Sequence, residues 1–323
     1  MSGRATWGVI ATIKAPDDEI LAFAAHHLDL GAHRLYLYLD DEAPQAQAHL
    51  EAHPKVRVVR TDDAWWAKRR GRPEKHQTRQ FVNARHALNR KQGCDWLAHI
   101  DVDEFLWPEG DIGALLAALP ADCLTARVRP IEALADPGGG FPTFFKGTHV
   151  ARAARQAAAE RVHGGWAAHL PGGFLSHVQG KLFVRHGHGL KLRIHNAMQG
   201  EVENPGLREL DAVRLCHLHA PSWERFRAHY RYRLARGSYR DELRPQAGPD
   251  GLNLHTLFRR IEAERGEAGL REMFREVAEA QPALLARLEA EGLLHRCDLR
   301  LAEKVARHFP ERPPRHGGHS TAV

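Results

Sequence analysis

The sequence predicts an α/β fold in which a largely parallel β-sheet is flanked by helices and followed by a helical extension. Short apolar, β-branched runs recur through residues 7–128, and helical patterns separate them. Strands joined by helices of this length usually pair in parallel. After residue 253, by contrast, apolar residues recur at helical spacing, which predicts helices alone.

The first predicted strand covers residues 7–13, because WGVIATI is apolar and β-branched. Pro16 and the acids at 17–19 predict a helix start, since carboxylates are stabilised at the positive end of the helix dipole. Apolar residues at helical spacing continue this helix, and Gly31 ends it. The next elements are predicted as strands at 34–39, 56–59 and 96–100 and as a helix at 75–92.

The pattern becomes less regular after residue 110. Asp111 can cap a helix that runs to Leu119, ahead of a fifth strand at 124–128. Glycine clusters interrupt residues 136–173, which we predict to form loops around a short helix, arranged as a mobile lid. Further elements are predicted as a strand pair at 181–185 and 190–194, a strand at 212–218 and a helix from Ser222 to Ala235.

These elements divide the chain into a domain at residues 1–240, a helical extension at 241–310 and a disordered tail at 311–323. Apolar residues make up 43% of the chain and charged residues 27%, which excludes intrinsic disorder for the chain as a whole. Apolar runs fall short of the ~20 residues that cross a bilayer. Residues 1–14 lack a secretion signal, and the cysteines form no CxxC pair. We therefore expect a cytoplasmic protein with reduced thiols.

The positive charge raises the hypothesis of a nucleic-acid-binding protein, since the net charge is +6 and the pI is about 9.3. The arginines, however, are spread along the chain and mostly lie near glutamates, so we expect no nucleic-acid partner. The dense basic stretch is KRRGRPEK at residues 68–75. It is either a solvated loop or a loop that meets a polyanionic ligand such as a diphosphate.

The most specific feature is the acidic end of the strand at 96–100, where Asp101, Asp103 and Glu104 follow. Alternate strand residues point to the same side, so Asp101 and Asp103 share one side of the sheet. Their backbones lie roughly 6.6 Å apart along an ideal strand, too far for both carboxylates to chelate one small ion. We expect Asp103 to bind Mg²⁺ or Mn²⁺, and Asp101 to reach the ion through water or to contact a ribose hydroxyl.

Residues 96–106, WLAHIDVDEFL, resemble the Asp-x-Asp segment of family 2-like glycosyltransferases. They are most similar to the bacterial branch whose motif is Asp-x-Asp-Glu-Phe. The resemblance covers residues 6–240 and implies the Rossmann-like GT-A fold, which binds nucleotide sugars. It also implies that a hexose is transferred from a nucleotide-sugar donor, with Mn²⁺ or Mg²⁺ neutralising the departing nucleoside diphosphate.

The resemblance implies roles for individual residues. Asp40 or Asp41 would contact the base or ribose of the donor, although Asp41 can equally end its strand in a turn. Glu19 is either a donor contact or a simple helix N-terminal acid, because Asp17 or Asp18 stands where such chains often carry Asn. Further donor contacts are implied for Thr12, Lys14, Gln80, Asp101, Lys181 and His195.

A late histidine completes the metal site in several GT-A enzymes, which implies His219 as a metal ligand after the strand at 212–218. His217 shares its face, and both are alternatively ordinary core or surface imidazoles. If the transfer inverts the anomeric centre, a base must accept the proton of the acceptor hydroxyl. Glu132 and Asp136 follow the fifth strand and are the candidates, with the choice left open.

Two other functions compete with this hypothesis. Asp101, Asp103 and Glu104 could begin a two-metal phosphoryl-transfer or nuclease site, which would need further carboxylates at other strand ends. The basic stretch at 68–75 could instead serve a nucleic-acid-binding module. For the glycosyltransferase, the expected partners are a nucleotide-sugar donor and a glycan or lipid-linked acceptor. The helices after residue 253 would dock on a membrane surface or pack against the catalytic domain.

Overall fold

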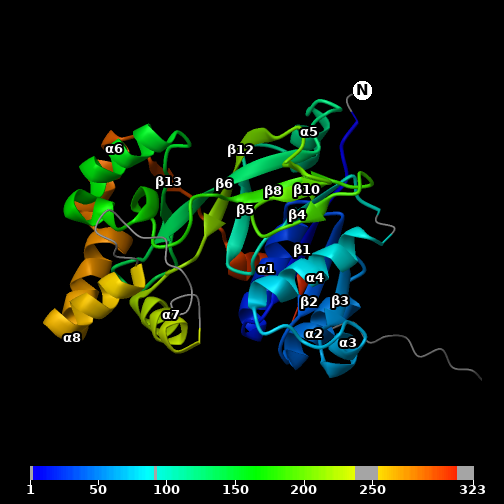
Figure 1. Ribbon diagram of the computed structural model, residues 1–323, viewed down its shortest axis with the longest axis horizontal. Coiled ribbons are helices and arrows are strands. Elements are labelled where there is room, and N and C mark those ends of the chain that lie inside the picture. The colour runs from blue at the N-terminus through cyan, green and yellow to red at the C-terminus, as the bar shows by residue number, and fades with distance from the viewer. Residues whose placement is uncertain (1–2, 91–92, 237–253, 311–323) are drawn as a thin grey trace, which may run out of the picture. The chain divides into compact units, whose positions relative to one another are not determined.

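The computed structural model describes residues 3–90, 93–236 and 254–310 (Figure 1). The chain forms two compact units, each built from separate segments. The first comprises residues 1–129, 180–215 and 299–323, and the second comprises 130–179 and 216–298. The second unit therefore includes residues 130–179, which the sequence assigns to the first domain. The predicted boundary between residues 240 and 241 and the predicted disordered tail lie outside the described residues.

The first unit contains a parallel sheet with the strand order β4-β1-β2-β3 (Figure 1). Every residue of the central strand β1 is buried, as its apolar sequence predicts. The four strands are β1 (Trp7–Ile13), β2 (Arg34–Leu39), β3 (Val56–Arg60) and β4 (Trp96–His99). Helices join them, which confirms the predicted α/β class with a mostly parallel sheet.

Antiparallel strands extend this sheet. Strand β8 (Lys181–Arg185) pairs with β4 on one edge and with β6 (Thr125–Leu134) on the other. The predicted pairing of 181–185 with 190–194 is therefore wrong, because both edges of β8 are already occupied. Instead, β9 (Lys191–Leu192), β10 (Ala197–Gln199) and β11 (Val202–Glu203) form a small sheet of their own. Strand β5 (Glu104–Pro108) pairs with β12 (Arg208–His217).

Helices α1 and α5 follow the predicted signals at their ends, whereas α4 ends at Leu88, before the predicted end at residue 92. Helix α1 carries three acids in its first turn and is followed by Gly31 at φ +90°, a conformation that favours glycine. Asp111 caps α5 by accepting a hydrogen bond from the Ala114 N–H at 2.8 Å. The remaining bounds are α1 (Asp17–Asp29), α2 (Pro44–Ala52), α3 (Asp63–Ala67), α4 (His76–Leu88), α5 (Ile112–Ala117) and α10 (Leu301–His308).

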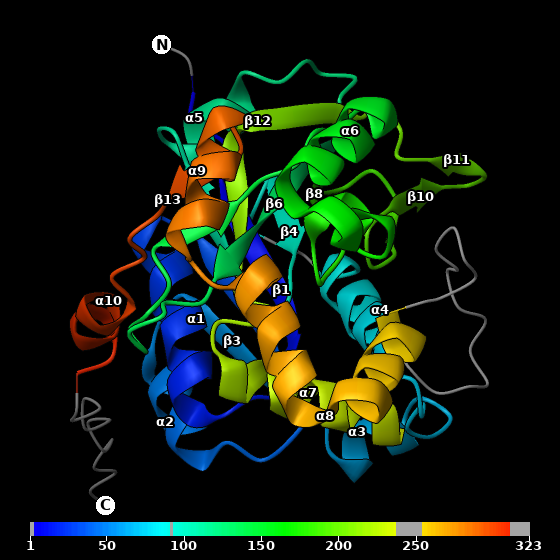
Figure 2. The same cartoon turned by 90° about the vertical axis from the view of Figure 1, so that its left-hand side faces the viewer.

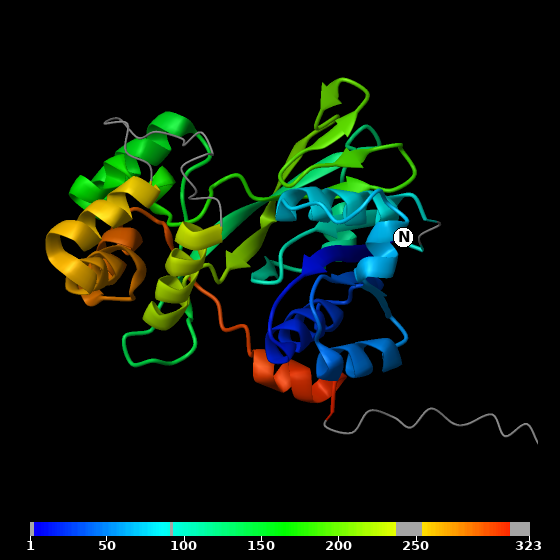
Figure 3. The same cartoon turned by 60° about the horizontal axis from the view of Figure 1, so that its bottom comes forward.

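Helix α10 returns to the first unit and lies beside α1 (Figure 3). Lys304 is buried and lies 3.1 Å from Nδ1 of His26, whose Nε2 donates to the Leu106 carbonyl at 2.7 Å. Arg307 of α10 forms an ion pair with Asp29, the last residue of α1. Because Nδ1 must be unprotonated to accept from an ammonium group, this contact requires a neutral His26.

Neutral, buried histidines make the first unit sensitive to acid. The pKa of His27 is lowered to about 4, mainly by burial and to a smaller extent by the nearby Lys304. The unfolded chain takes up this proton near pH 6.5, so the free energy of unfolding should fall as pH decreases from about 6.5 to about 4. One such histidine contributes about 1.4 kcal/mol per pH unit within that window.

Denaturant unfolding at several pH values measures this slope. His27→Gln should reduce it by about 1.4 kcal/mol per pH unit, because one proton uptake is removed. Replacing His188, which is exposed, should leave the slope unchanged. An unchanged slope in His27→Gln would contradict the assignment of a neutral, buried imidazole.

The second unit combines a small antiparallel sheet with helices. Strands β13 (Leu294–Arg296) and β7 (Phe144–Lys146) pair with each other, and β7 also pairs with the end of β6. The expectation that residues 253–309 are helical throughout is therefore wrong at β13. Helices α6 and α9 contact each other (Figure 2). The helices are α6 (Arg152–His163), η1 (Gly164–Ala168), η2 (Pro171–Gly173), α7 (Trp223–Arg236), α8 (Leu254–Ala278) and α9 (Pro282–Ala290).

Aromatic side chains fill the core of the second unit. Phe226 lies at the centre, with its ring 5.5 Å from that of Phe258 and 5.1 Å from that of Phe274. Helix α6 provides the short helix predicted within residues 136–173, and the predicted lid movement of this region stays a prediction. Within the described residues, no helix is both long and apolar enough to pass through a bilayer.

Candidate functional site

Polar side chains of the first unit gather where the parallel strands end. Thr12 lies near the end of β1, Asp40 directly follows β2, and Asp101 follows β4 after one residue. The carboxyl ends of parallel strands meet at one edge of a sheet, which is where ligands bind in such folds. The structure therefore brings together residues that the sequence predicts separately as site residues.

Asp101 is half-buried and forms the centre of a cluster of charged side chains. One carboxylate oxygen accepts a hydrogen bond from Lys181 Nζ at 2.6 Å, and the other accepts from Nε2 of Gln80. Lys181 also lies 3.5 Å from Glu104, whose carboxylate accepts the Asp101 N–H at 2.8 Å. Both oxygens of Asp101 are thus already engaged, which favours a positioning or ribose-binding role for Asp101 over direct metal ligation.

The charges in this cluster stabilise one another. Desolvation alone raises the pKa of Asp101, but the Lys181 ammonium outweighs it and holds that pKa well below the usual range. Desolvation likewise lowers the pKa of Lys181, while Asp101 and Glu104 together raise it well above its usual value. Lys181 is therefore charged at neutral pH, and it compensates the buried Glu104 and the half-buried Asp101.

A glycine sets the position of Lys181. Gly180 adopts φ +73°, and an added Cβ would lie 2.1 Å from the Val128 carbonyl oxygen. His195 also binds here, since its Nδ1 lies 2.9 Å from the Gly180 carbonyl oxygen and donates to it. Burial lowers the pKa of His195 to about 4, so this histidine is neutral. His195 is thus held beside Lys181 as an uncharged donor.

Asp40 is buried and forms ion pairs with two arginines. It accepts hydrogen bonds from Thr61 at 2.9 Å and from Nε of Arg79 at 2.7 Å, and it pairs with Arg72 at 3.1 Å. Asp41 is exposed and forms an ion pair with Lys14 at 3.0 Å. Of the two predicted donor contacts, Asp41 is therefore the accessible one, whereas Asp40 positions the arginines.

Helix α4 presents several polar groups to this edge. Asn83 donates to the hydroxyl of Thr12 at 3.1 Å, and Gln80 binds Asp101 as described above. His76, at the helix start, has a pKa that burial lowers and Asp101 raises in part. Arg79 and His76 were not predicted as site residues. His76 lies four residues before Gln80 and Arg79 lies four residues before Asn83, and this spacing places each pair on one face of the helix, which is a signal that could have identified them.

The basic stretch at 68–75 is attached to the same edge. Arg79 donates to the carbonyl oxygens of Pro73 at 2.9 Å and Glu74 at 2.8 Å. Within the stretch, Arg72 binds Asp40, and the guanidinium of Arg69 lies 3.2 Å from the centre of the Trp65 ring. These contacts make the stretch an ordered wall of the site rather than a fully solvated loop.

Asp103 and Glu19 lie at loop and helix-start positions of the first unit. Asp103 is half-buried in the turn between β4 and β5, and Glu19 is half-buried in the first turn of α1. A carboxylate in a turn beside buried strands is a suitable oxygen donor for a hard divalent cation. The metal-binding role of Asp103 and the donor contact of Glu19 stay predictions.

The two candidate bases belong to the second unit and differ in burial. Glu132 is 1% exposed; its oxygens accept the N–H groups of Leu175 at 3.0 Å and Ser176 at 2.7 Å, and Lys146 lies 3.1 Å away. Asp136 is exposed and accepts the Gly140 N–H at 2.7 Å. These contacts favour a structural role for Glu132 and leave Asp136 as the accessible candidate.

The structural role of Glu132 gives a testable prediction. Glu132→Gln should lower the free energy of unfolding by about 2 kcal/mol, because two N–H groups and Lys146 lose a charged acceptor. Asp136→Asn changes an exposed carboxylate in the same unit and should cost less than about 0.5 kcal/mol. Denaturant unfolding compares the two variants, and equal stability losses would contradict the assignment.

His219, the predicted histidine ligand, is buried in the second unit. It lies two residues after His217, which ends β12, and the two rings are 5.1 Å apart. Neither the metal role of His219 nor that of Asp103 follows from burial alone. Both roles stay predictions.

Comparison with known proteins identifies no family. No protein-family model matches the sequence, and no curated protein matches it. The chain is similar to a crystal structure of galactosyltransferase LgtC with donor and acceptor sugar analogues, at 11% identity and a TM-score of 0.28. It is also similar to an active-site mutant of LgtC, at 10% identity and a TM-score of 0.28. Both matches cover 55% of this chain and 57% of the other, just over half of its length.

Proposed function

We propose that the chain is a metal-dependent glycosyltransferase of GT-A type that transfers a hexose from a nucleotide-sugar donor. One observation carries this proposal: the Asp101-Val102-Asp103 segment follows a buried central strand of a parallel sheet, at the edge where Thr12 and Asp40 also lie. That edge is the usual ligand-binding edge of such sheets. The resemblance of residues 96–106 to the Asp-x-Asp-Glu-Phe motif supports it.

The donor contacts follow from accessibility. Asp41 and Lys14 are exposed beside the site and are proposed to contact the base or ribose. Asp101, held by Lys181 and Gln80, is proposed to accept a hydrogen bond from a ribose hydroxyl. Thr12, Glu19 and His195 are proposed at the margin of the nucleotide pocket, while Lys181 acts by keeping Asp101 in place.

Asp103 is proposed to hold the divalent cation, Mn²⁺ or Mg²⁺, and the prediction of His219 as a further ligand is retained. A bound cation of this kind would neutralise the charge of the departing nucleoside diphosphate. Asp103 suits the role because it is a half-buried carboxylate in a turn, and because Lys181 already compensates its neighbours Asp101 and Glu104.

The acceptor is proposed to be a hydroxyl of a glycan or of a lipid-linked sugar. Asp136 is the more accessible of the two candidate bases and is proposed to accept the hydroxyl proton in an inverting transfer. A cytoplasmic location and docking of the later helices on a membrane surface remain proposals from the sequence.

Phosphoryl transfer by a two-metal site fits the contacts less well. Such a site needs several carboxylates that share two cations. Asp40 is instead occupied by Arg79 and Arg72, Asp101 by Lys181, and Asp62 by the Trp65 N–H that it caps at 2.9 Å. The arrangement therefore favours one cation over two.

A turnover panel tests the proposal. The full chain is incubated with UDP-, GDP-, ADP- and CMP-linked sugars, with Mn²⁺, Mg²⁺ or a chelator, and the released nucleotide is measured. Release with one nucleotide class that depends on the cation is the expected result. No release from any donor, together with Mn²⁺-dependent cleavage of single-stranded DNA, would contradict it.

A further inference from the structure

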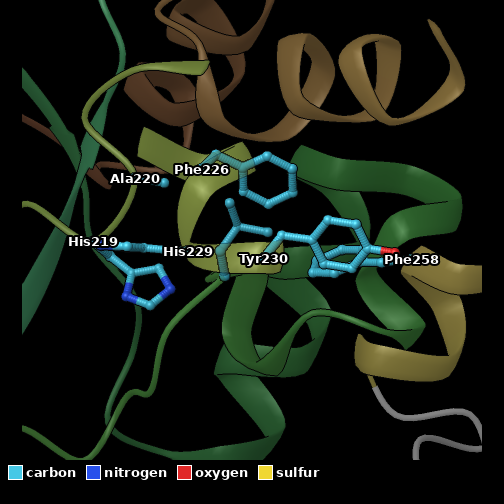
Figure 4. Close-up of a pocket in the computed structure, with 7 residues that line it drawn as sticks. His219, Ala220, Phe226, His229, Tyr230 and Phe258 are labelled. Carbon is cyan, nitrogen blue, oxygen red and sulfur yellow. The ribbon is translucent and has the colours of Figure 1, made fainter. Parts of the chain in front are cut away.

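Buried histidines have different surroundings in the two units. In the second unit, His219 and His229 line a pocket of about 10 Å³ together with Phe258, and this volume holds about one water molecule (Figure 4). In the first unit, His26 and His27 of α1 instead contact protein groups. This second pair therefore belongs to a side-chain network that connects separate elements of the fold.

Helix α1 contacts the backbone of β5 at Leu106. Nε2 of His26 donates to the Leu106 carbonyl oxygen at 2.7 Å, and the Leu106 N–H points to Nε2 of His27 at 3.5 Å. The ring of Phe105 packs beside both imidazoles, with its centre 5.3 Å from that of His26 and 6.2 Å from that of His27. The two histidines therefore cover one edge of β5, as a neighbouring strand would.

Lys304 of α10 determines which nitrogen of His26 carries the proton. Its ammonium group donates hydrogen bonds and has no acceptor, so it can bind Nδ1 at 3.1 Å only through the nitrogen lone pair. The single ring proton of the neutral imidazole then lies on Nε2, where the Leu106 carbonyl oxygen accepts it. A further contact holds α10 beside α1, since Nε2 of His308 lies 3.4 Å from the Asp29 carboxylate. Helix α10 therefore selects the tautomer of His26 that binds β5.

Strand β5 begins in the acidic motif. The Glu104 N–H donates to the Asp101 carbonyl oxygen at 3.1 Å, and the Glu104 carboxylate accepts the Asp101 N–H at 2.8 Å. These two bonds close a turn in which Val102 and Asp103 are the central residues. Leu106 follows Glu104 by two residues in the same strand, so a shift of β5 at Leu106 would move the turn that carries Asp103.

We propose that His26 and Lys304 are positioning residues of the donor site: Lys304 orients His26, His26 fixes β5 through Leu106, and β5 holds the turn that carries Asp103. Both side chains act through other residues and touch neither the nucleotide sugar nor the cation. This role rests on the proposed function, because Asp103 is the residue proposed to hold the cation. The hydrogen bonds of the network belong to the fold and do not depend on that function.

Two double variants of the full chain test this role. Lys304→Met first replaces the ammonium group by an apolar side chain, so that a change at His26 does not leave a buried cation without its acceptor. In this background His26→Gln keeps an N–H donor for the Leu106 carbonyl oxygen, whereas His26→Leu removes it. The Mn²⁺ concentration for half-maximal turnover should be about 10-fold or more higher in Lys304→Met/His26→Leu than in Lys304→Met/His26→Gln, because residues that support a metal ligand change metal affinity by this order.

Leu50→Ala is the matched control for stability. Leu50 is buried in α2 of the same unit and lies outside the network, so its replacement destabilises the fold without removing any of these hydrogen bonds. Rates are measured well below the Tm of each variant, where the chain is folded. The half-maximal Mn²⁺ concentration of Leu50→Ala should then stay within about 2-fold of the wild-type value, because a loss of global stability does not alter the site of the folded chain.

Hydrogen exchange at residues 101–107 provides a second readout that needs no turnover. These amides should exchange faster in Lys304→Met/His26→Leu than in Lys304→Met/His26→Gln, while those of β1 exchange equally in both. Equal exchange, an equal Mn²⁺ requirement in the two double variants, or the same rise in Leu50→Ala would overturn the positioning role. Absence of turnover in the wild-type chain, with the difference in exchange intact, would instead reject only the proposed function.

Discussion

Asp103→Ala should reduce kcat/KM for the nucleotide-sugar donor by about 1,000-fold or more, with the fold retained. The variant removes the oxygen donor that is proposed to hold the cation, and loss of such an electrostatic group costs about 3–4 kcal/mol or more in the transition state. The fold should survive, because Asp103 is half-buried in a turn and not part of a strand. Initial rates with saturating Mn²⁺ and the preferred donor provide the measurement.

The matched control for this variant is Asp122→Ala. Asp122 is also a carboxylate of the first unit, but its side chain is 72% exposed and lies 3.6 Å from Arg208 on the surface. Its replacement should change the rate by less than about 2-fold, since an isolated surface ion pair contributes little. If Asp103→Ala retains full activity, or if both variants lose activity equally, Asp103 is not the cation ligand.

Lys181→Met should destabilise the first unit by about 3–5 kcal/mol. The Lys181 side chain is 1% exposed and lies 2.6 Å from Asp101 and 3.5 Å from Glu104, which is itself 0% exposed. Removing the ammonium leaves two neighbouring carboxylates without their cation, and this is more costly than losing the pair as a whole. Denaturant unfolding, monitored in the first unit, measures the loss.

A double variant separates charge from packing in this cluster. Lys181→Met combined with Asp101→Asn removes one of the uncompensated charges, so it should be more stable than Lys181→Met alone. Lys191→Met, at an exposed position on β9, is the control and should change stability by less than about 0.5 kcal/mol. Stability of Lys181→Met equal to wild type would contradict the buried ion cluster.

The elements with strong local patterns are well predicted from the sequence. Strands β1, β2 and β8 have the predicted bounds, because runs such as 7–13 and 34–39 are apolar on both faces and lie inside the sheet. Helix α1 is also predicted, since acids start it and Gly31 ends it. Each of these elements can be predicted because its own residues carry the pattern that specifies it.

Short elements that depend on distant partners are not predicted. Strand β5 carries the Glu104-Phe105 part of the acidic motif and exists because it pairs with β12 about a hundred residues later. Strand β13 comprises only Leu294–Arg296, within a region of helical composition, and it forms by pairing with β7. A segment of that length has too few residues to show a periodic pattern.

The roles of the site residues, like the short strands, depend on partners that are distant in the sequence. Asp101 and Lys181 are each predicted as site residues, but the sequence does not show that they bind each other across 80 positions. Asp40 is predicted as a donor contact, yet its carboxylate is occupied by Arg79 and Arg72. Residue type and strand position therefore predict where a site lies, whereas the division of roles depends on long-range ion pairs.

Thermal unfolding with nucleoside diphosphates tests the central claim most directly. The full chain is heated with UDP, GDP, ADP or CDP, each with and without Mn²⁺, and Asp103→Ala is measured in parallel. The proposed donor site predicts a rise in Tm that needs one nucleotide and Mn²⁺ together, because a ligand that binds only the folded state stabilises it. The rise should be absent in Asp103→Ala. No rise with any nucleotide, or an equal rise in the variant, would contradict a cation-dependent donor site at this sheet edge.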